Sequence, residues 1–174
     1  MGLDGKIYES EEVSQSSRIS NMQRSKRARE IIEKISYVTI ATVSEDGMPW
    51  NAPVFAAYDK NYNFYWGTYR GSQKSKNINN NKNVFLVIYD SASAPGKGGG
   101  IYIKATATEL SDQNEIEFAH KLLRGRHVVP YWKIEQVQGE APIRLYKAVP
   151  EKVWMNSEGK ENGHYIDTRV EIKL

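Results

Sequence analysis

The spacing of apolar residues along the 174-residue chain changes period several times. Apolar residues first recur at helical spacing, at Ala28, Ile31, Ile32 and Ile35. This spacing predicts an amphipathic helix that begins near Ser25. The β-branched run 37–43 then predicts a strand, and the pair Asp46-Gly47 supplies the positive φ of a tight hairpin turn. A helix followed by a β-hairpin therefore opens the folded part of the chain.

Alternation of apolar and polar positions dominates the rest of the sequence. Together with the apolar run 84–89, it predicts strands over residues 50–58, 63–67, 84–89, 101–110, 143–149, 152–156 and 164–172. Two short helices are expected between them, one over 72–81 capped by Ser72 and one after Asp112, where Glu115 completes a capping box. Short hairpin links make neighbouring strands antiparallel. The pattern predicts a mainly β fold, an antiparallel barrel, closed or nearly closed, with short peripheral helices.

Composition narrows the class of protein. Residues 1–24 lack a hydrophobic period and are expected to form a flexible arm, followed by a single domain over 25–174. No apolar run is long enough to cross a bilayer, and the N-terminus has no apolar core of a secretory signal. The absence of cysteine excludes disulfides and permits a reducing compartment. We therefore expect a cytoplasmic protein that binds no membrane, and a net charge of +3 is too small to indicate nucleic-acid binding alone.

The segment from Thr68 to Lys76 carries the candidate chemistry. It leaves a predicted strand and enters the helix that Ser72 caps. A helix start offers unpaired N–H groups and the positive end of the helix dipole, which together suit a phosphate. Hydroxyl donors and positive charge are added by Thr68, Ser72, Ser75, Arg70, Lys74 and Lys76. An ordinary capped helix with solvated lysines has the same residues, so this segment alone leaves both interpretations open.

Short motifs on both sides of this segment give it a context. They are Ile40-Ala41-Thr42-Val43, Asp46-Gly47-Met48-Pro49, Ala52-Pro53-Val54, Phe64-Tyr65-Trp66-Gly67-Thr68, Ser72-Gln73-Lys74, Asn77-Ile78 and Asn81-Lys82-Asn83-Val84. In this order and spacing they resemble the pyridoxamine 5′-phosphate oxidase-related family of FMN-binding split barrels. The resemblance covers residues 28–110 and, more loosely, 143–172.

This resemblance implies an FMN site and a homodimer with FMN at the subunit interface. The flavin phosphate is assigned to Ser72 and Lys74, with Gln73 between them, and Thr68 lines the same site with Gly67 beside it. The second strand is expected beside the flavin ring, largely through the backbone of Asn51, Ala52, Pro53 and Val54. Trp154 is expected to approach the flavin, as C-terminal tryptophans do in related proteins.

The implied function is an FMN-dependent oxidoreductase that acts on a small-molecule redox substrate, with FMN supplying the redox chemistry. No catalytic acid or base stands out. Gln73 stands where enzyme members of the family often carry arginine. Residues 154–170 do not match the segment with which the vitamin-converting oxidases hold their substrate, so a true pyridoxamine phosphate oxidase is not expected. A non-catalytic flavin carrier or redox sensor, a deazaflavin in place of FMN, and an oligonucleotide-binding barrel stay open as alternatives.

Other polar features of the sequence point to structure. The spacing of His120 and His127 fits no zinc pattern, so we expect no metal site and interpret these histidines as packing or surface residues. His164, with Asp167 and Arg169, is interpreted as part of a barrel strand, and a place near a substrate stays open as the alternative. The glycine-rich stretch 94–100 lacks a Gly-Lys-Ser/Thr element, and we interpret it as a loop near the cofactor.

Overall fold

The computed structural model describes residues 10–94, 99–126, 131–162 and 164–174. These residues form α1 (Ser10–Lys34), β1 (Tyr37–Val43), β2 (Pro49–Tyr58), β3 (Phe64–Tyr69), α2 (Gln73–Asn80), β4 (Asn83–Tyr89), β5 (Gly100–Glu109), α3 (Gln113–Arg126), the short 3-10 helix η1 (Ile134–Gln136), β6 (Ile143–Glu161) and β7 (His164–Ile172). Each predicted strand and helix lies within one of these elements apart from shifts of a few residues at the ends, and the two exceptions are β6 and α1.

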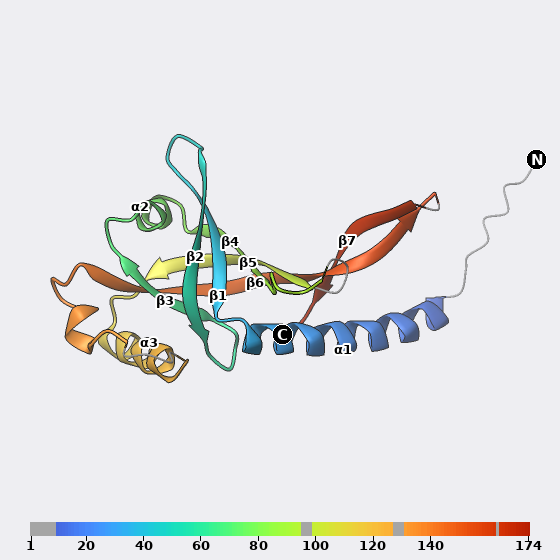
Figure 1. Ribbon diagram of the computed structural model, residues 1–174, viewed down its shortest axis with the longest axis horizontal. Helices are drawn as coiled ribbons and strands as arrows, with labels where there is room; N and C mark the ends of the chain where they lie inside the picture. Colours follow the sequence, from blue (N-terminus) through green and yellow to red (C-terminus); the bar gives the residue numbers. More distant parts are fainter. Residues whose placement is uncertain (1–9, 95–98, 127–130, 163) are drawn as a thin grey trace, which may run out of the picture.

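The strands close into a barrel. They pair in the order β3-β2-β1-β4-β5-β6, and β6 also pairs with β3, which closes the barrel. Each of these pairs of neighbouring strands is antiparallel. The predicted fold class, a mainly β antiparallel barrel with peripheral helices, is confirmed. β7 lies outside the barrel and pairs with the second half of β6, and the two strands form a ribbon that projects beside α1 (Figure 1).

β6 corrects the prediction of two separate strands over 143–149 and 152–156. It runs without interruption through Pro150. Proline has no N–H to donate to a neighbouring strand, and the register between β5 and β6 shifts between Lys104 and Ala105, where Ala105 faces Pro150. The bulge lets one long strand pass the proline, so that β6 serves both the barrel and the outer ribbon.

α1 also differs from the prediction, because it begins at Ser10. The missing hydrophobic period predicted an irregular arm as far as residue 24. No glycine or proline occurs between Ser10 and Arg24, so no residue there interrupts the helical backbone. The Arg24 guanidinium donates to Ser157 Oγ at 3.0 Å, which ties this part of α1 to β6.

Two apolar clusters hold the fold together. The barrel core contains Trp66, Tyr146 and Leu86, with Ile31 and Ile32 of α1 covering one end. A second cluster lies between the barrel wall and α3, where Leu123 and Leu145 are fully buried. α2 packs against β1, β2 and β5 at the other end of the barrel (Figure 1).

A basic side chain joins α3 to the end of α1. The Arg126 guanidinium donates to the carbonyl oxygens of Ile32 and Ile35 at 2.6 and 2.8 Å, and it lies 4.8 Å from the centre of the Tyr58 ring. Carbonyl groups at a helix end lack helical partners, and a cation is favoured there. None of the helices formed by the described residues has the length and apolar character needed to cross a bilayer.

Candidate functional site

The barrel is split between β2 and β3. These strands pair only over Ala56–Tyr58 and Phe64–Trp66, whereas β2 pairs with β1 from Pro49 onward and β3 pairs with β6 as far as Tyr69. The first half of β2 therefore has a backbone edge that no described strand covers. The predicted ring contacts Asn51, Ala52, Pro53 and Val54 lie along this edge.

Thr68 lies at the opposite side of the split. It is 8% exposed and shares its strand face with Phe64 and Trp66, which point into the barrel core. Its strand leads directly into the turn before α2. The structure therefore places Thr68 near the helix start that was predicted to bind phosphate.

The start of α2 is organised by a capping serine. Ser72 Oγ accepts from the N–H of Ser75 at 3.4 Å, and the Ser72 N–H donates to the carbonyl of Tyr69 at 3.0 Å. The N–H groups of Gln73 and Lys74 precede the first residue that can donate within the helix, so they are available to an anion. Ser72 as the helix cap is confirmed.

Gly71 lies in the turn into α2. A Cβ added to Gly71 would come 2.6 Å from the Tyr69 ring, which therefore lies directly against the turn. Tyr69 is exposed, so its ring has room to move aside. The hydrogen bond from the Ser72 N–H to the Tyr69 carbonyl closes the turn and keeps the end of β3 beside the first residues of α2.

Lys74 is the cation at this helix start. Its side chain is half-buried, and burial lowers the pKa of its ammonium group below the ordinary value of 10.5. Among the described residues it has no hydrogen bond or ion pair. A half-buried ammonium with no counter-charge is electrostatically costly, and a bound anion would offset that cost.

A buried chain of polar side chains supports the helix start from below. Ser75 is fully buried, and its Oγ lies 2.9 Å from Ser72 Oγ and donates to the Tyr69 carbonyl at 3.0 Å. The Tyr146 hydroxyl lies close to Ser75 and donates to Glu109 Oε2 at 2.9 Å. Burial, followed by the contact with the Glu109 carboxylate, raises the pKa of Tyr146 to about 12, so its hydroxyl keeps its proton at neutral pH.

The far end of this chain is an ion pair. Arg144 is 8% exposed, and its Nε lies 3.3 Å from Glu109 Oε1. Its remaining N–H groups donate to the carbonyl oxygens of Gly139, Ala141 and Ile143. None of Tyr146, Glu109 and Arg144 was a candidate in the sequence, because only the pairing of β6 with β3 and β5 brings these residues toward α2.

A second polar chain fixes α2 to the β1–β2 hairpin. The Gln73 amide donates to Asn77 Oδ1 at 2.8 Å, and the Asn77 amide donates to Thr42 Oγ1 at 2.9 Å. Asn77 and Thr42 are 1% and 2% exposed. The amide of Gln73 is thus held in one orientation at the mouth of the barrel.

Two predicted contacts point away from the helix start. A Cβ on Gly67 would come 2.4 Å from the Trp132 ring, so this face of β3 is covered by the segment after α3. Trp154 lies on the outer face of the barrel, stacked on Phe85 at 6.2 Å. Phe85 of β4 faces Ala41 of β1, which in turn faces Asn51 of β2. This row of neighbouring side chains links Trp154 to the β2 edge.

The remaining candidates have structural explanations or lie elsewhere. His120 is buried, and its Nε2 lies 2.6 Å from the Trp132 carbonyl oxygen, which confirms a packing role. His127 and most of the glycine-rich stretch, residues 95–98, lie outside the described residues. The interpretation of His164 as part of a barrel strand is wrong, because this exposed residue begins β7, which among the described strands pairs only with β6, outside the barrel. No group of three metal-ligating side chains occurs within the described ranges.

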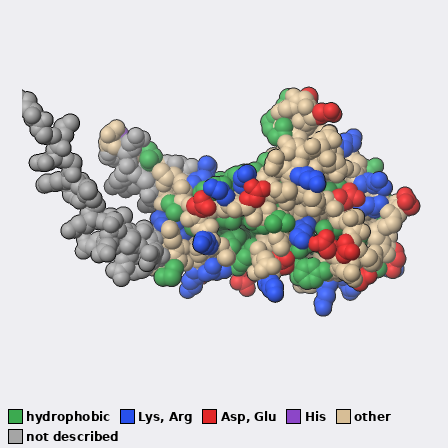
Figure 2. Space-filling model, turned by 180° about the vertical axis from the view of Figure 1, so that it is seen from behind, with side chains coloured by type: hydrophobic (Ala, Val, Ile, Leu, Met, Phe, Trp, Pro, Cys, Tyr) green, Lys and Arg blue, Asp and Glu red, His purple; other side chains and the backbone are tan. Residues whose placement is uncertain are grey.

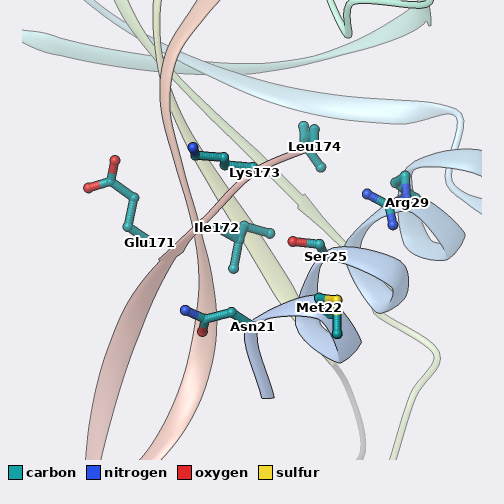
Figure 3. A pocket seen from close by; sticks show the side chains of 8 residues that line it. All are labelled: Asn21, Met22, Ser25, Arg29, Glu171, Ile172, Lys173 and Leu174. Atoms are coloured by element: carbon teal, nitrogen blue, oxygen red, sulfur yellow. The ribbon is translucent and has the colours of Figure 1, made fainter. Parts of the chain in front are cut away.

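A cavity of about 730 Å³ lies between α1 and the end of β7, away from the predicted site (Figure 3). Its wall is formed by Asn21, Met22, Ser25, Arg29, Glu171, Ile172, Lys173 and Leu174. None of these residues was a candidate in the sequence. Both sides of this cavity come from elements outside the six-stranded barrel.

The fold and the split at β2 define the chain as a split-barrel protein. The family model described as pyridoxamine 5′-phosphate oxidase matches residues 25–157. The chain therefore belongs to the pyridoxamine 5′-phosphate oxidase family, as the sequence motifs indicated. No curated protein sequence matches the chain significantly.

Solved structures share this fold at low sequence identity. ChuZ of Campylobacter jejuni has a TM-score of 0.66 and 14% identity, over 84% of this chain and 63% of that one. A heme binding protein from Mycobacterium smegmatis has a TM-score of 0.62 and 14% identity, over 81% and 55%. A FAD-binding protein from Mesorhizobium loti has a TM-score of 0.55 and 15% identity, over 73% and 89%. These likenesses show a common fold.

Proposed function

We propose that the chain binds FMN at the split between β2 and β3 and acts as an oxidoreductase on a small-molecule substrate. The observation that carries the proposal is Lys74, a half-buried cation without a described partner, beside the free N–H groups at the start of α2. Ser72 and Thr68 add hydroxyl groups, and the Gln73 amide is held beside them. These residues suit a phosphate group.

The uncovered edge of β2 suits the flavin ring. Backbone N–H and C=O groups along Asn51–Val54 are available there, except that Pro53 has no N–H. Such groups would orient the ring and stabilise negative charge that develops on it during reduction. Bound FMN would supply the electron transfer, and the described residues offer no evident general acid or base.

We further propose that the protein is a homodimer with the flavin at the interface. The outer face of β1 and β4 exposes Tyr37, Phe85 and Tyr89, at 62%, 38% and 50%. Large aromatic side chains are typical of interface cores. Trp154, stacked on Phe85, would then lie near the flavin site through this face. The cysteine-free chain would suit a reducing compartment such as the cytoplasm.

The absorption spectrum of the purified protein tests flavin binding, together with mass spectrometry of the released ligand. We expect a flavin spectrum and the mass of a flavin after purification or after incubation with FMN and desalting. A protein that stays colourless after that incubation would contradict the proposal. The heme-binding neighbour makes a heme spectrum a distinct outcome that would also contradict it.

Lys74→Ala tests where the phosphate lies. Loss of one charge-assisted contact should weaken FMN binding by roughly 1.5–3 kcal/mol, about ten- to a hundredfold. Lys82→Ala, which removes an exposed lysine shortly after α2, serves as the control and should leave the affinity unchanged. Equal affinities for wild type and Lys74→Ala would place the phosphate elsewhere.

Turnover separates an enzyme from a flavin carrier or redox sensor. Stopped-flow reduction of the bound flavin by NADH or NADPH, followed by reoxidation with small acceptors, measures it. A flavin spectrum that responds to neither nucleotide nor any small acceptor would favour the non-catalytic alternative.

A further inference from the structure

A small cavity adjoins the proposed phosphate site. It has a volume of about 280 Å³ and lies between the β1–β2 hairpin and the first residue of α2. Its wall is formed by Ser44, Asp46, Met48, Trp50 and Gln73. Gln73 is shared with the proposed phosphate site, so the two are contiguous. The volume lies just below the range for whole drug-sized ligands and suits a single ring system.

One wall of this hairpin cavity is aromatic and polarisable. Trp50 is 47% exposed and Met48 is 63% exposed, although both are large hydrophobic residues. Figure 2 shows hydrophobic and acidic side chains together at the tip of the projecting hairpin. An accessible indole face is a stacking surface for a planar heteroaromatic ring.

The other walls carry hydrogen-bonding groups and a negative charge. Asp46 Oδ1 accepts from Ser44 Oγ and from the N–H of Met48, and the Ser44 contact lowers the pKa of Asp46, which keeps it ionised. A carboxylate repels a phosphate and accepts from amine or hydroxyl groups. This cavity is therefore suited to the base end of a nucleotide.

The amide of Gln73 completes the wall. One N–H of its amide donates to the buried Asn77, which is itself bonded to Thr42. The Gln73 carbonyl and its second N–H are left for a ligand. A side-chain amide of this kind pairs with the N6 and N7 edge of adenine.

The charge at the start of α2 is compatible with a diphosphate. Gln73 is neutral, and Lys74 is the half-buried cation of the first helical turn, while Lys76 is exposed. A phosphate monoester carries up to two negative charges near neutral pH, and a diphosphate linked on both sides also carries two, one on each phosphate. The charge of the site therefore admits both FMN and FAD, and the walls of the hairpin cavity favour FAD.

We propose that the hairpin cavity binds an adenine ring, so that the preferred ligand of this site is FAD, with its FMN part bound as proposed above. The adenine stacks on Trp50, its amine end faces Asp46 and Gln73, and the diphosphate crosses the start of α2. The inference rests on the proposed flavin site and extends it by the adenylyl half of the ligand.

Titration of flavin-free protein with FMN and with FAD tests this assignment. Stacking of one base on an aromatic side chain corresponds to about five- to a hundredfold in affinity. We expect wild type to bind FAD more tightly than FMN by about tenfold or more. Trp50→Ala should abolish this preference and leave the FMN affinity unchanged. Phe118→Ala, which removes an exposed aromatic ring of α3, should change neither affinity.

Two results would overturn the adenine site while leaving flavin binding intact. One is a wild-type protein that binds FAD no more tightly than FMN. The other is an equal loss of both affinities in Trp50→Ala, which would place the indole against the part common to both flavins. A wild-type protein that binds neither flavin would refute the proposed function itself, and the adenine site with it.

Discussion

The helices at the two ends of the barrel are held by different forces. α1 buries Ala28, Ile31 and Ile32, all apolar, whereas α2 buries Ser75 and Asn77 beside a single large apolar residue. Apolar burial is favourable in any orientation that excludes water, while hydrogen bonds require particular atoms at particular distances. The difference indicates that α1 contributes mainly to stability, whereas the hydrogen bonds of α2 fix the position of that helix on the barrel.

The free energy that burial contributes differs between α1 and α2. A buried aliphatic side chain contributes about 1.5–3 kcal/mol, whereas a satisfied hydrogen bond contributes roughly 0.5–1.5 kcal/mol net. Buried polar groups are expensive once a partner is lost. α2 should therefore be the less stabilising helix and the one that is more sensitive to removal of a polar atom.

Ile32→Ala should cause the largest loss of stability among these substitutions. Ile32 is 1% exposed in the barrel core, and its truncation should lower the free energy of unfolding by about 2–5 kcal/mol. Urea denaturation measures the change. The folded fraction should keep its FMN affinity, because α1 lies at the end of the barrel away from α2. A loss of affinity in the folded protein would show that the two ends are coupled.

Asn77→Ala should cause the second-largest loss of stability, after Ile32→Ala. It leaves Thr42 and Gln73 without the amide that joins them, at a cost of about 1–3 kcal/mol in the free energy of unfolding. FMN affinity should fall as well, since the Gln73 amide is no longer held. Asn80→Ala, at the exposed end of the same helix, should stay within about 0.5 kcal/mol of wild type. Equal effects of the two substitutions would refute a special role for the buried amide.

Tyr146→Phe isolates the polar chain below the helix start. It removes a hydroxyl that donates to Glu109 and lies close to Ser75, and it keeps the ring that stacks on Trp66. The free energy of unfolding should fall by about 0.5–1.5 kcal/mol. Binding of FMN should weaken severalfold, while binding of riboflavin, which lacks the phosphate, should not change. An equal loss for both ligands would indicate a general distortion of the barrel.

The same variant should alter the response to alkaline pH. The folded-state pKa of Tyr146, about 12, lies above its unfolded value of 10.0, so the stability it contributes is fully present below pH 10 and lost between 10 and 12. Chemical denaturation at pH 9, 10 and 11 should therefore show a smaller loss of stability in Tyr146→Phe than in wild type.

Lys74→Met should have the smallest effect on the flavin-free protein. Burial lowers the folded-state pKa of Lys74, so the charged form opposes folding at neutral pH. Replacing it should leave the free energy of unfolding unchanged or raise it slightly. That advantage over wild type should shrink as the pH rises toward the unfolded value of 10.5. A marked loss of stability would mean that Lys74 has a structural partner.

Local features of the site could be read from the sequence. Ser72 was predicted as a cap because serine before a helix satisfies a free N–H, and this depends only on neighbouring residues. The hairpin at Asp46-Gly47 follows from the positive φ of Gly47, which is +85°. The strands that carry Asn51–Val54 and Thr68 likewise follow from local alternation.

What the sequence determined by itself was therefore the set of strands, the capped helix and the family motifs, all of which depend on short-range preferences. The tertiary structure decided the closure of β6 onto β3, the contacts of buried Tyr146 with Trp66 and Glu109, and the side of the barrel to which Gly67 and Trp154 belong. Alternation shows which residues share a face, but strand pairing brings together residues far apart in the chain. Pairing of β3 with β6 is what places Tyr146 close to Ser75, below the candidate phosphate site.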